Sequence, residues 1–353
     1  MKINKRINNQ IHSIEIIDFI KIDHFLKNQI SDIDIIVIDK NLIKNKVIKK
    51  FYDKFSNRCF LLKGQERIKS LSNFNDLIEK ILKKGIQRKS KLVSIGGGTV
   101  GDLSGFLSSS LLRGIDHIMI PTSLLAMVDS AIGGKTGVNS VYGKNLIGSF
   151  YLPKKVLICP EFLKTLPSRE INCGFAEIIK YSYILPGPIK DKLYAFKNIN
   201  KSNIKDIIKF SILTKLKYVS DFQEKSNHRR SRAILNFGHS IGHAIENSNL
   251  YKGSIKHGEA VALGMLIELK ISIHLKYYRK SIEEELQLFK KFNLPCDYKR
   301  FLTPKNIKNL IKKINFDKKV YGQSVNFILI DNYGGFVKKM TFRKIEDLLN
   351  KIN

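Results

Sequence analysis

KLVSIGGGTVGD, residues 91–102, joins a short apolar segment to a glycine-rich turn. Its first five residues are typical of a buried parallel strand, and DLSGFLSSSLL, residues 102–112, predicts a helix directly after the turn. Gly96, Gly98 and Gly101 match the GxGxxG pattern, in which glycines let a pyrophosphate approach the backbone at a helix N-terminus. That pattern normally follows the first strand of a domain, whereas here it follows the third. A plain tight turn therefore stays open as the alternative.

Other apolar segments on both sides of this turn are typical of strands, at residues 33–39, 60–62 and 117–120. Helical spacing is found between them, at residues 41–55 and 75–84. This alternation predicts a Rossmann-like α/β domain with a mostly parallel sheet. Ligands of such sheets bind where the strands end. Asp39, at the end of the first strand, is better placed to contact a ribose than Asp116, the only acid about 20 residues beyond the glycines.

The pattern changes to helices in the second half of the chain. Helices are predicted at residues 169–183, 203–219, 238–247, 258–278, 282–292 and 304–313, with a late strand at 325–330. Pro153, Pro160 and Pro167 mark the change of pattern. We therefore predict two domains, an α/β domain over residues 1–165 and a mainly α-helical domain over residues 166–353.

The composition is that of a globular protein with an excess of positive charge. The 353 residues carry a formal net charge of +31, yet the lysines are spread along the chain and accompany abundant Ile and Asn. This distribution favours a coding bias over a nucleic-acid surface, although the charge would also attract small anionic substrates. The four cysteines form no paired framework, and neither a signal peptide nor a membrane-spanning run is found. We expect a cytoplasmic protein without nucleic-acid or membrane partners.

A second glycine-rich segment, residues 121–148, concentrates lysines beside polar side chains. Lys135 and Lys144 each follow a glycine, and Asp129 and Asn145 lie close to them in sequence. The GxxxxGK[ST] pattern fails because Asp129 stands where its first glycine is needed. Lysines beside flexible glycines and amide donors instead predict a site for phosphate or carboxylate groups.

NFGHSIGHAIENSNLYKGSIKHGE, residues 236–259, contains three of the eight histidines. His239 and His243 are four residues apart, so on a helix they share one face and could hold a metal ion. Two polar residues on a half-buried helix are the alternative. His257, in the HGE triplet, strengthens the metal hypothesis.

Nine stretches resemble those of 3-dehydroquinate synthases and occur in the same order. They are GGGTVGDLSGF, LLRG, PTSLLAMVDSAIGGKTGVN, GKNLIGSF, LKTLPSRE, GFAEIIKY, LNFGHSIGHAIE, HGEAVALGM and DKK. The resemblance covers roughly residues 33–330. It implies an NAD-binding domain followed by a metal- and substrate-binding domain, in a cytoplasmic homodimer that uses NAD and Zn²⁺ or Co²⁺.

The resemblance also implies a reaction. Members of the family convert 3-deoxy-D-arabino-heptulosonate 7-phosphate to 3-dehydroquinate and phosphate, a step of the shikimate pathway. NAD transiently oxidises a ring carbinol, phosphate leaves by β-elimination, the hydride returns, and an intramolecular aldol step closes the new ring. The substrate is a small anionic sugar phosphate that carries a carboxylate.

Matching positions assign roles residue by residue. The metal ligands implied are Glu177, His239 and His257. The catalytic residues implied are His243, Lys135, Lys180 and Glu224. The substrate-binding residues implied are Arg113, Asp129, Lys135, Asn145, Arg232, Asn236 and Lys318. The NAD-binding residues implied are Asp39, Glu66, Lys69, Gly97, Gly98, Thr99, Asp102, Thr122, Ser123, Lys144 and Thr165. Arg113 matches an arginine that can be supplied across the dimer.

Three positions leave alternatives open. The glutamate that precedes the first zinc histidine by about eleven residues in the family is replaced by His228, so Glu224 is its counterpart only if residues are inserted. Lys318 and Lys319 cannot be separated by spacing, and an anion-binding lysine upstream is either Lys215 or Lys217.

Two other enzyme classes share much of this pattern. Synthases of 2-deoxy-scyllo-inosose or of valiolones use the same cofactors on substrates without the carboxylate, which Arg232 and the paired lysines argue against. A polyol dehydrogenase of related fold would release NADH, but a neutral polyol needs no cluster of cations such as Lys135, Lys144, Lys180 and Arg113.

Overall fold

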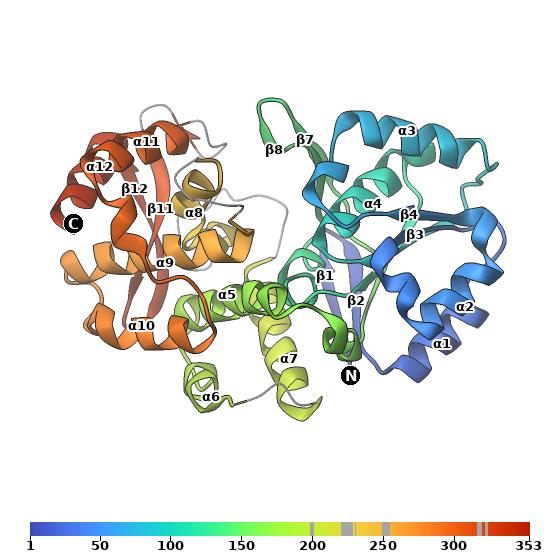
Figure 1. The fold of residues 1–353 in the computed structure, drawn as a ribbon, viewed down its shortest axis with the longest axis horizontal. Helices are drawn as coiled ribbons and strands as arrows, with labels where there is room; N and C mark the ends of the chain where they lie inside the picture. The colour runs from blue at the N-terminus through green and yellow to red at the C-terminus, as the bar shows by residue number, and fades with distance from the viewer. Residues whose placement is uncertain (198–200, 220–228, 230, 249–254, 316–319, 322–323) are drawn as a thin grey trace. The chain divides into compact units, whose positions relative to one another are not determined.

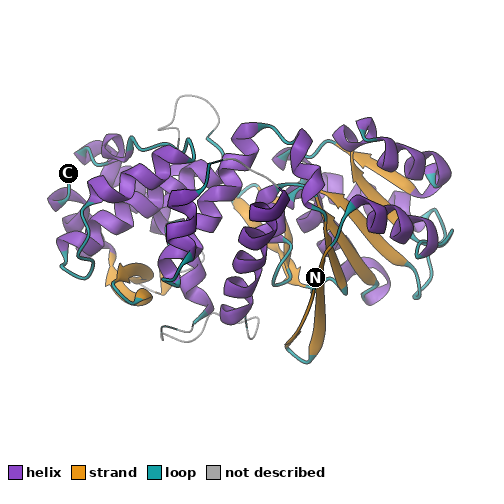
Figure 2. Ribbon diagram, turned by 90° about the horizontal axis from the view of Figure 1, so that it is seen from below, coloured by secondary structure: helices purple, strands orange, loops and turns teal. Residues whose placement is uncertain are grey.

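Two units make up the part of the chain that the computed structural model describes, which is residues 1–353 except 198–200, 220–228, 230, 249–254, 316–319 and 322–323. The N-terminal unit is centred on residues 1–167 and the C-terminal unit on residues 168–353. Helix α7 (Lys201–Tyr218) contributes residues to both. The predicted fold class, an α/β domain followed by a mainly helical one, is confirmed (Figures 1 and 2).

A seven-stranded sheet organises the N-terminal unit. Its strands follow the order β1 (Lys2–Ile7), β2 (Gln10–Ile16), β9 (Lys155–Ile158), β6 (Asp116–Pro121), β5 (Lys91–Gly96), β3 (Ile35–Asp39) and β4 (Cys59–Leu62). The β1–β2 pair is antiparallel and every other pairing is parallel. Strand β3 is buried from Ile35 to Ile38, as expected of a strand covered on both faces.

Helices cover both faces of this sheet (Figure 1). They are α1 (Phe19–Asn28), α2 (Lys46–Lys54), α3 (Leu71–Leu82) and α4 (Gly98–Ser110). Side chains alternate along a strand, so Ile35 and Val37 face one side, where they join one core with Leu77 of α3 and Leu103 of α4. Gly101 lets α4 approach the sheet, because a Cβ there would lie 1.8 Å from Cε of Met119 on β6.

Helix starts in this unit follow from local capping side chains. Asp18 accepts a hydrogen bond from the backbone of Lys21, Asn45 from Val47, and Ser70 from Asn73. The Ser70 cap starts α3 at Leu71, four residues before the predicted start. The Asn45 cap likewise divides the helix predicted over 41–55 into a 3₁₀ turn (Lys40–Lys44) and α2.

The C-terminal unit is built around two buried helices, α5 (Ser168–Ile184) and α9 (His257–His274). The other helices of this unit are α6 (Ile189–Ala195), α8 (His239–Glu246), α10 (Ile282–Lys291), α11 (Pro304–Asn315) and α12 (Phe342–Lys351). A small antiparallel sheet consists of β10 (Val320–Tyr321), β11 (Ser324–Asp331) and β12 (Gly334–Thr341). Helix α9 is apolar almost all round, which is why it lies within the core.

Glycines bring α5, α8 and α9 into backbone contact. A Cβ on Gly258, the second residue of α9, would lie 2.5 Å from Cα of Cys173 on α5. A Cβ on Gly264 would lie 2.0 Å from the carbonyl oxygen of Gly238, the residue before α8. The polar residues at the starts of α8 and α9 are thereby held close to α5.

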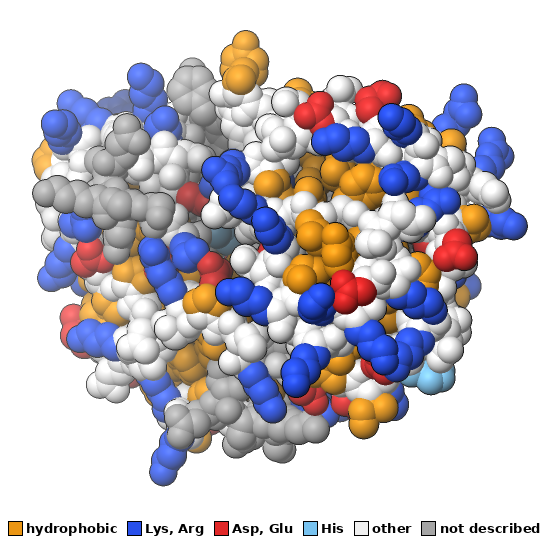
Figure 3. Space-filling view, turned by 45° about the vertical axis from the view of Figure 1, so that its right-hand side comes forward, with side chains coloured by type: hydrophobic (Ala, Val, Ile, Leu, Met, Phe, Trp, Pro, Cys, Tyr) orange, Lys and Arg blue, Asp and Glu red, His pale blue; other side chains and the backbone are white. Residues whose placement is uncertain are grey.

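Several elements were not predicted from the sequence. They include the β1–β2 hairpin, α6, α12, and a hairpin of β7 (Lys135–Ser140) and β8 (Gly143–Phe150) within the segment expected to be a loop. None of the described helices is long and apolar enough to cross a membrane. On the face shown in Figure 3, Lys and Arg side chains are dispersed among apolar, acidic and uncharged groups.

Candidate metal centre and dinucleotide site

Glu177, His239 and His257 meet in the C-terminal unit. They come from the middle of α5 and the first residues of α8 and α9, and one ligand atom from each lies within 4.8 Å of the others. Oε1 of Glu177 is 3.5 Å from Nε2 of His239 and 3.8 Å from Nε2 of His257. One carboxylate oxygen therefore faces two imidazole nitrogens, which is a donor set that suits Zn²⁺ or Co²⁺.

The other ring nitrogen of each histidine has a partner that fixes the tautomer. Nδ1 of His239 donates to the carbonyl oxygen of Phe237 at 3.1 Å, because a carbonyl can only accept. Nδ1 of His257 donates to Oε2 of Glu246 at 3.2 Å, because an ionised carboxylate also only accepts. In the neutral form of each ring, Nε2 is then the nitrogen without a proton, which is the one that can act as a ligand.

The Glu177 carboxylate fits a cation. Its side chain is fully buried, and its Oε1 accepts no hydrogen bond from the described residues. Lys180, one turn later on α5 and equally buried, places its ammonium next to Oε2, which leaves Oε1 directed at the histidines. A buried acceptor such as Oε1 costs free energy unless a donor or a positive charge lies beside it, so this atom suits contact with a cation.

His243 lies beside this cluster but outside the group of ligand atoms. Its ring centroid is 5.4 Å from that of His239 and 5.8 Å from that of His257. The HxxxH pair of the sequence therefore divides. His239 joins His257 and Glu177, while His243 is a neighbour of these two rings.

The N-terminal unit places the predicted dinucleotide residues where its strand order reverses. Strand β4, the next strand after β3 in the chain, lies on one side of β3, and the following strand, β5, lies on its other side. The order of the strands therefore reverses between β3 and β5, at their carboxyl ends. Asp39 ends β3, and Gly97 precedes α4 directly after β5. The N-cap residue of α4, Gly97, has no side chain that could cap the helix, which suits its first amides to bind a phosphate. The backbone amide of Thr122, after β6, donates to the carbonyl of Gly96 at 2.9 Å and brings Ser123 beside the same turn.

Lys69 links several of the predicted residues. Its side chain is 3% exposed, and its ammonium lies 2.8 Å from Oδ2 of Asp102 on α4. The same ammonium donates to Oδ1 of Asn145 on β8 and lies 3.8 Å from Oε1 of Glu66. Asn139 of β7 donates to that Glu66 oxygen at 2.8 Å and accepts from the amide of Asn145 at 2.9 Å. Hydrogen bonds thus connect the β7–β8 hairpin to the residues before α3.

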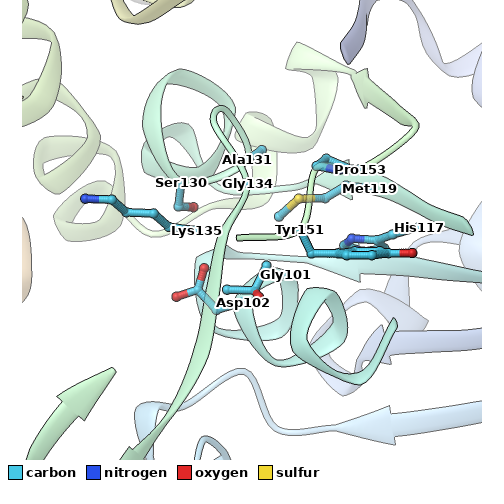
Figure 4. A pocket seen from close by; sticks show the side chains of 11 residues that line it. Gly101, Asp102, His117, Met119, Ser130, Ala131, Gly134, Lys135, Tyr151 and Pro153 are labelled. Atoms are coloured by element: carbon cyan, nitrogen blue, oxygen red, sulfur yellow. The ribbon is translucent and has the colours of Figure 1, made fainter. Parts of the chain in front are cut away.

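A small pocket lies between α4, β6 and the start of β7 (Figure 4). Asp102 and Lys135 line it, together with Ser130 and the buried His117. Burial lowers the pKa of His117 to about 3, so that ring is neutral at physiological pH. The pocket brings one predicted dinucleotide residue and one predicted substrate residue to the same cavity.

The remaining predicted residues occupy several parts of the chain. In the N-terminal unit, Arg113 is exposed with φ +68°, and Lys144 is exposed on β8. Thr99 lies in the first turn of α4. Asp129 lies in a short π-helical turn (Ala126–Ser130), and Thr165 ends a 3₁₀ helix (Pro160–Thr165). In the C-terminal unit, Arg232 is buried and shares a 3₁₀ helix (Arg232–Asn236) with Asn236. Lys215 is buried, whereas Lys217 is exposed. Glu224 and Lys318, with their alternatives His228 and Lys319, lie outside the described residues.

Two residues at these sites were not identified from the sequence. Glu246 contacts His257, and Asn139 joins the Lys69 network. Glu246 had a usable signal, because it follows His243 by three residues and His239 by seven and so lies on the same helical face. Asn139 had none, because its strand had not been predicted.

Comparison with known proteins identifies relatives over most of the chain. The family model described as 3-dehydroquinate synthase N-terminal matches residues 59–173, and that described as 3-dehydroquinate synthase C-terminal matches residues 174–320. A 3-dehydroquinate synthase of Pelagibacter ubique is 38% identical over 362 residues, covering 98% of this chain and 96% of its own. One from Prochlorococcus marinus is 41% identical over 312 residues, covering 85% and 84%.

Solved structures share the fold at lower identity. A 2-deoxy-scyllo-inosose synthase complexed with carbaglucose-6-phosphate, NAD⁺ and Co²⁺ superposes with a TM-score of 0.79 at 23% identity, covering 99% of this chain and 100% of its own. A 2-epi-5-epi-valiolone synthase from Streptomyces hygroscopicus with NAD⁺ and Zn²⁺ bound gives 0.79 at 21%, covering 97% and 96%. A probable glycerol dehydrogenase from Sinorhizobium meliloti gives 0.63 at 15%, covering 96% and 95%.

Proposed function

Because the chain belongs to the 3-dehydroquinate synthase family, we propose that its two units hold the two cofactors of one cyclisation reaction. The family activity is the activity of this chain, which converts 3-deoxy-D-arabino-heptulosonate 7-phosphate to 3-dehydroquinate and phosphate. Residues 1–165 bind NAD, and residues 166–353 bind a divalent metal and the substrate. The main support for this assignment is that the Nε2 atoms of His239 and His257 both face Oε1 of Glu177.

The metal assigned to Glu177, His239 and His257 is Zn²⁺ or Co²⁺. When bound, it supplies a Lewis acid that lowers the pKa of a substrate hydroxyl. Three protein ligands leave coordination positions for substrate oxygens. The structural neighbours that contain Co²⁺ or Zn²⁺ support this choice.

The dinucleotide assigned to the N-terminal unit is NAD, which supplies a hydride acceptor and returns the hydride within one turnover. The uncapped start of α4 binds its pyrophosphate, and Asp39 binds a ribose hydroxyl at the edge where the strand order reverses. The list of NAD contacts is completed by Glu66, Lys69, Gly97, Gly98, Thr99, Asp102, Thr122, Ser123, Lys144 and Thr165.

Chemistry at the substrate is assigned to His243, Lys135, Lys180 and Glu224. His243 transfers protons, because its imidazole lies beside the metal ligands without being one of them. The buried ammonium of Lys180 stabilises negative charge that develops near Glu177.

Binding of the substrate's carboxylate and phosphate is assigned to Arg113, Lys135, Asn145, Arg232, Asn236 and Lys318, and binding of its hydroxyls to Asp129. A buried guanidinium such as that of Arg232 suits a planar carboxylate, since two of its N–H groups can donate to the two carboxylate oxygens. This requirement separates the proposed substrate from the sugar phosphates without a carboxylate.

A substrate comparison tests the function. Phosphate release is measured with the heptulosonate phosphate, with sedoheptulose 7-phosphate and with glucose 6-phosphate, and absorbance at 340 nm follows NADH. We expect turnover of the heptulosonate phosphate alone, without net NADH. Turnover of only the other two would assign a different cyclase, and accumulation of NADH would assign a polyol dehydrogenase.

We also propose a cytoplasmic homodimer in which Arg113 acts across the interface. An Arg113→Ala chain and a His243→Ala chain, each inactive alone, are combined in one heterodimer. If Arg113 acts in the partner's site, one intact site forms and activity returns. If it acts within its own chain, each site lacks one residue and the heterodimer stays inactive.

A further inference from the structure

The backbone of His257 and its ring are positioned by different contacts. His257 is the first residue of α9, and the close approach of Gly258 to Cys173 places that end of the helix against α5. Two ion pairs, Arg169 with Glu259 and Lys256 with Glu170, join the starts of the same two helices. These contacts fix the Cα of His257 but leave the ring two rotatable bonds, and the His257 side chain is 36% exposed.

A hydrogen bond to the ring itself comes from α8. Glu246, the last residue of α8, is 11% exposed at its side chain, and its Oε2 accepts from Nδ1 of His257 at 3.2 Å. This bond engages the edge of the imidazole opposite Nε2, which faces Glu177 at 3.8 Å. Glu246 therefore lies behind the ring relative to the three ligand atoms, and it is not one of the group that could share a metal ion.

The two histidine ligands are held in unlike ways. Nδ1 of His239 donates to the neutral backbone carbonyl of Phe237, whereas Nδ1 of His257 donates to the Glu246 carboxylate. A carboxylate behind an imidazole fixes its orientation and also makes Nε2 a stronger donor to a metal. His239 is additionally confined, because its side chain is only 12% exposed and its helix begins at the Gly238 contact with Gly264.

We propose that Glu246 is the positioning residue that orients His257 for the metal, an inference that rests on the proposed metal centre. The hydrogen bond holds the ring with Nε2 directed at Glu177 before any metal arrives. Without it, the ring of His257 must be ordered as part of metal binding, which weakens binding without removing a ligand.

Variants of Glu246 test this with metal alone. The dissociation constants of Zn²⁺ and Co²⁺ are measured by competition with a chromophoric chelator, and the visible spectrum of the Co²⁺ form reports ligand geometry. We expect Glu246→Ala to raise both constants roughly 10- to 100-fold and to change the Co²⁺ spectrum. Glu246→Gln, whose amide oxygen still accepts from Nδ1, should give a smaller rise and a near-normal spectrum.

A control separates positioning from general stability. Glu283→Gln, an exposed substitution on α10, should leave both constants at the wild-type values. Urea unfolding of metal-free Glu246→Gln should match the metal-free wild type, which shows that any loss of affinity does not come from misfolding.

Two results would overturn the inference in distinguishable ways. If wild-type protein binds metal stoichiometrically and Glu246→Ala binds it equally well with the same Co²⁺ spectrum, Glu246 does not position His257, while the metal centre stands. If wild-type protein binds no metal, the metal centre itself is wrong, and the role of Glu246 with it.

Discussion

The ammonium of Lys69 lies 2.8 Å from the carboxylate of Asp102, although the Lys69 side chain is only 3% exposed. The pair joins the residue before the Ser70 cap of α3 to the first turns of α4, directly after the glycine-rich turn. Asn145 accepts from the same ammonium, so one buried cation connects two predicted dinucleotide residues with a predicted substrate residue.

Replacing Lys69 by Met should therefore affect both stability and cofactor binding. Asp102 is 21% exposed and would keep some hydration, so we expect a loss of roughly 1–3 kcal/mol in the free energy of unfolding. Urea unfolding measures that loss, and fluorescence titration measures weaker NAD binding. The matched control is Lys80→Met, an exposed lysine on α3, for which the change in unfolding free energy should stay below about 0.5 kcal/mol.

Removing the metal should abolish activity. Dialysis against a chelator leaves Glu177, His239 and His257 without the cation that joins them, and added Zn²⁺ or Co²⁺ should restore turnover. Metal content and phosphate release are measured on the same samples. Full activity in protein shown to be metal-free would contradict the assigned centre.

His243→Ala and His239→Ala should fail for different reasons. The first removes a neighbour of the ligands, so stoichiometric metal should remain while turnover falls about 10²- to 10⁴-fold. The second removes a ligand, so both metal and activity should be lost. Metal analysis beside kinetics decides the matter, and loss of stoichiometric zinc from the His243 variant would reverse the two roles.

Gly258→Ala should weaken metal binding through the backbone. The new Cβ would lie 2.5 Å from both Cα and the carbonyl oxygen of Cys173, so α9 must move away from α5 and carry His257 with it. We expect a loss of roughly 1–3 kcal/mol in stability, measured by urea unfolding, and a raised dissociation constant for Zn²⁺. Gly187→Ala is the matched control, because nothing lies within 4 Å of its Cβ position and both quantities should be unchanged.

Glu285 should give the C-terminal unit a pH-dependent contribution to stability. Burial alone would raise the pKa of Glu285, but the charge and hydrogen bonds of Lys190, with those of Tyr183 and Tyr278, outweigh burial and lower it below its ordinary 4.5. A carboxyl group whose pKa is lower in the folded state stabilises the fold at any pH above its pKa in the unfolded state. That stabilisation is lost as the pH falls through its pKa in the folded state. The stability difference between wild type and Glu285→Gln, measured by urea unfolding, should therefore be largest near neutral pH and shrink as the pH falls below 4.5. A difference that grew on acidification would contradict the direction of this shift.

The fold was predictable where one local pattern determines an element. Residues 91–95 form a strand because they are apolar and end at glycine, and β5 extends this prediction by one residue. The β7–β8 hairpin was missed because glycines and lysines in Lys135–Phe150 resemble a loop, and pairing of the two strands decides the outcome. The β1–β2 hairpin was missed for a related reason, since its exposed, charged first strand has a weak apolar pattern.

The candidate site shows the limit of spacing more clearly. Helical spacing grouped His239 with His243, but the structure groups His239 with Glu177, which is 62 positions earlier, and with His257. Only the resemblance to a family could join such distant residues from the sequence. The carbonyl of Phe237 is a local partner of His239, two residues away. Helical spacing puts Glu246 on the face of α8 that carries the histidines, but its contact with His257 depends on how α8 and α9 pack, which no pattern in the sequence specifies.

The glycines where α8 meets α9 bear on how this centre could be redesigned. Gly238, Gly242 and Gly264 put backbone against backbone, since a methyl group on Gly264 would lie 2.0 Å from a carbonyl oxygen and one on Gly242 would lie 3.0 Å from another. The spacing between the helices that carry His239 and His257 therefore cannot be widened in small steps by exchanging core residues. A protein engineer seeking a different metal preference would have to leave these glycines intact and vary Glu246, whose side chain touches a ligand.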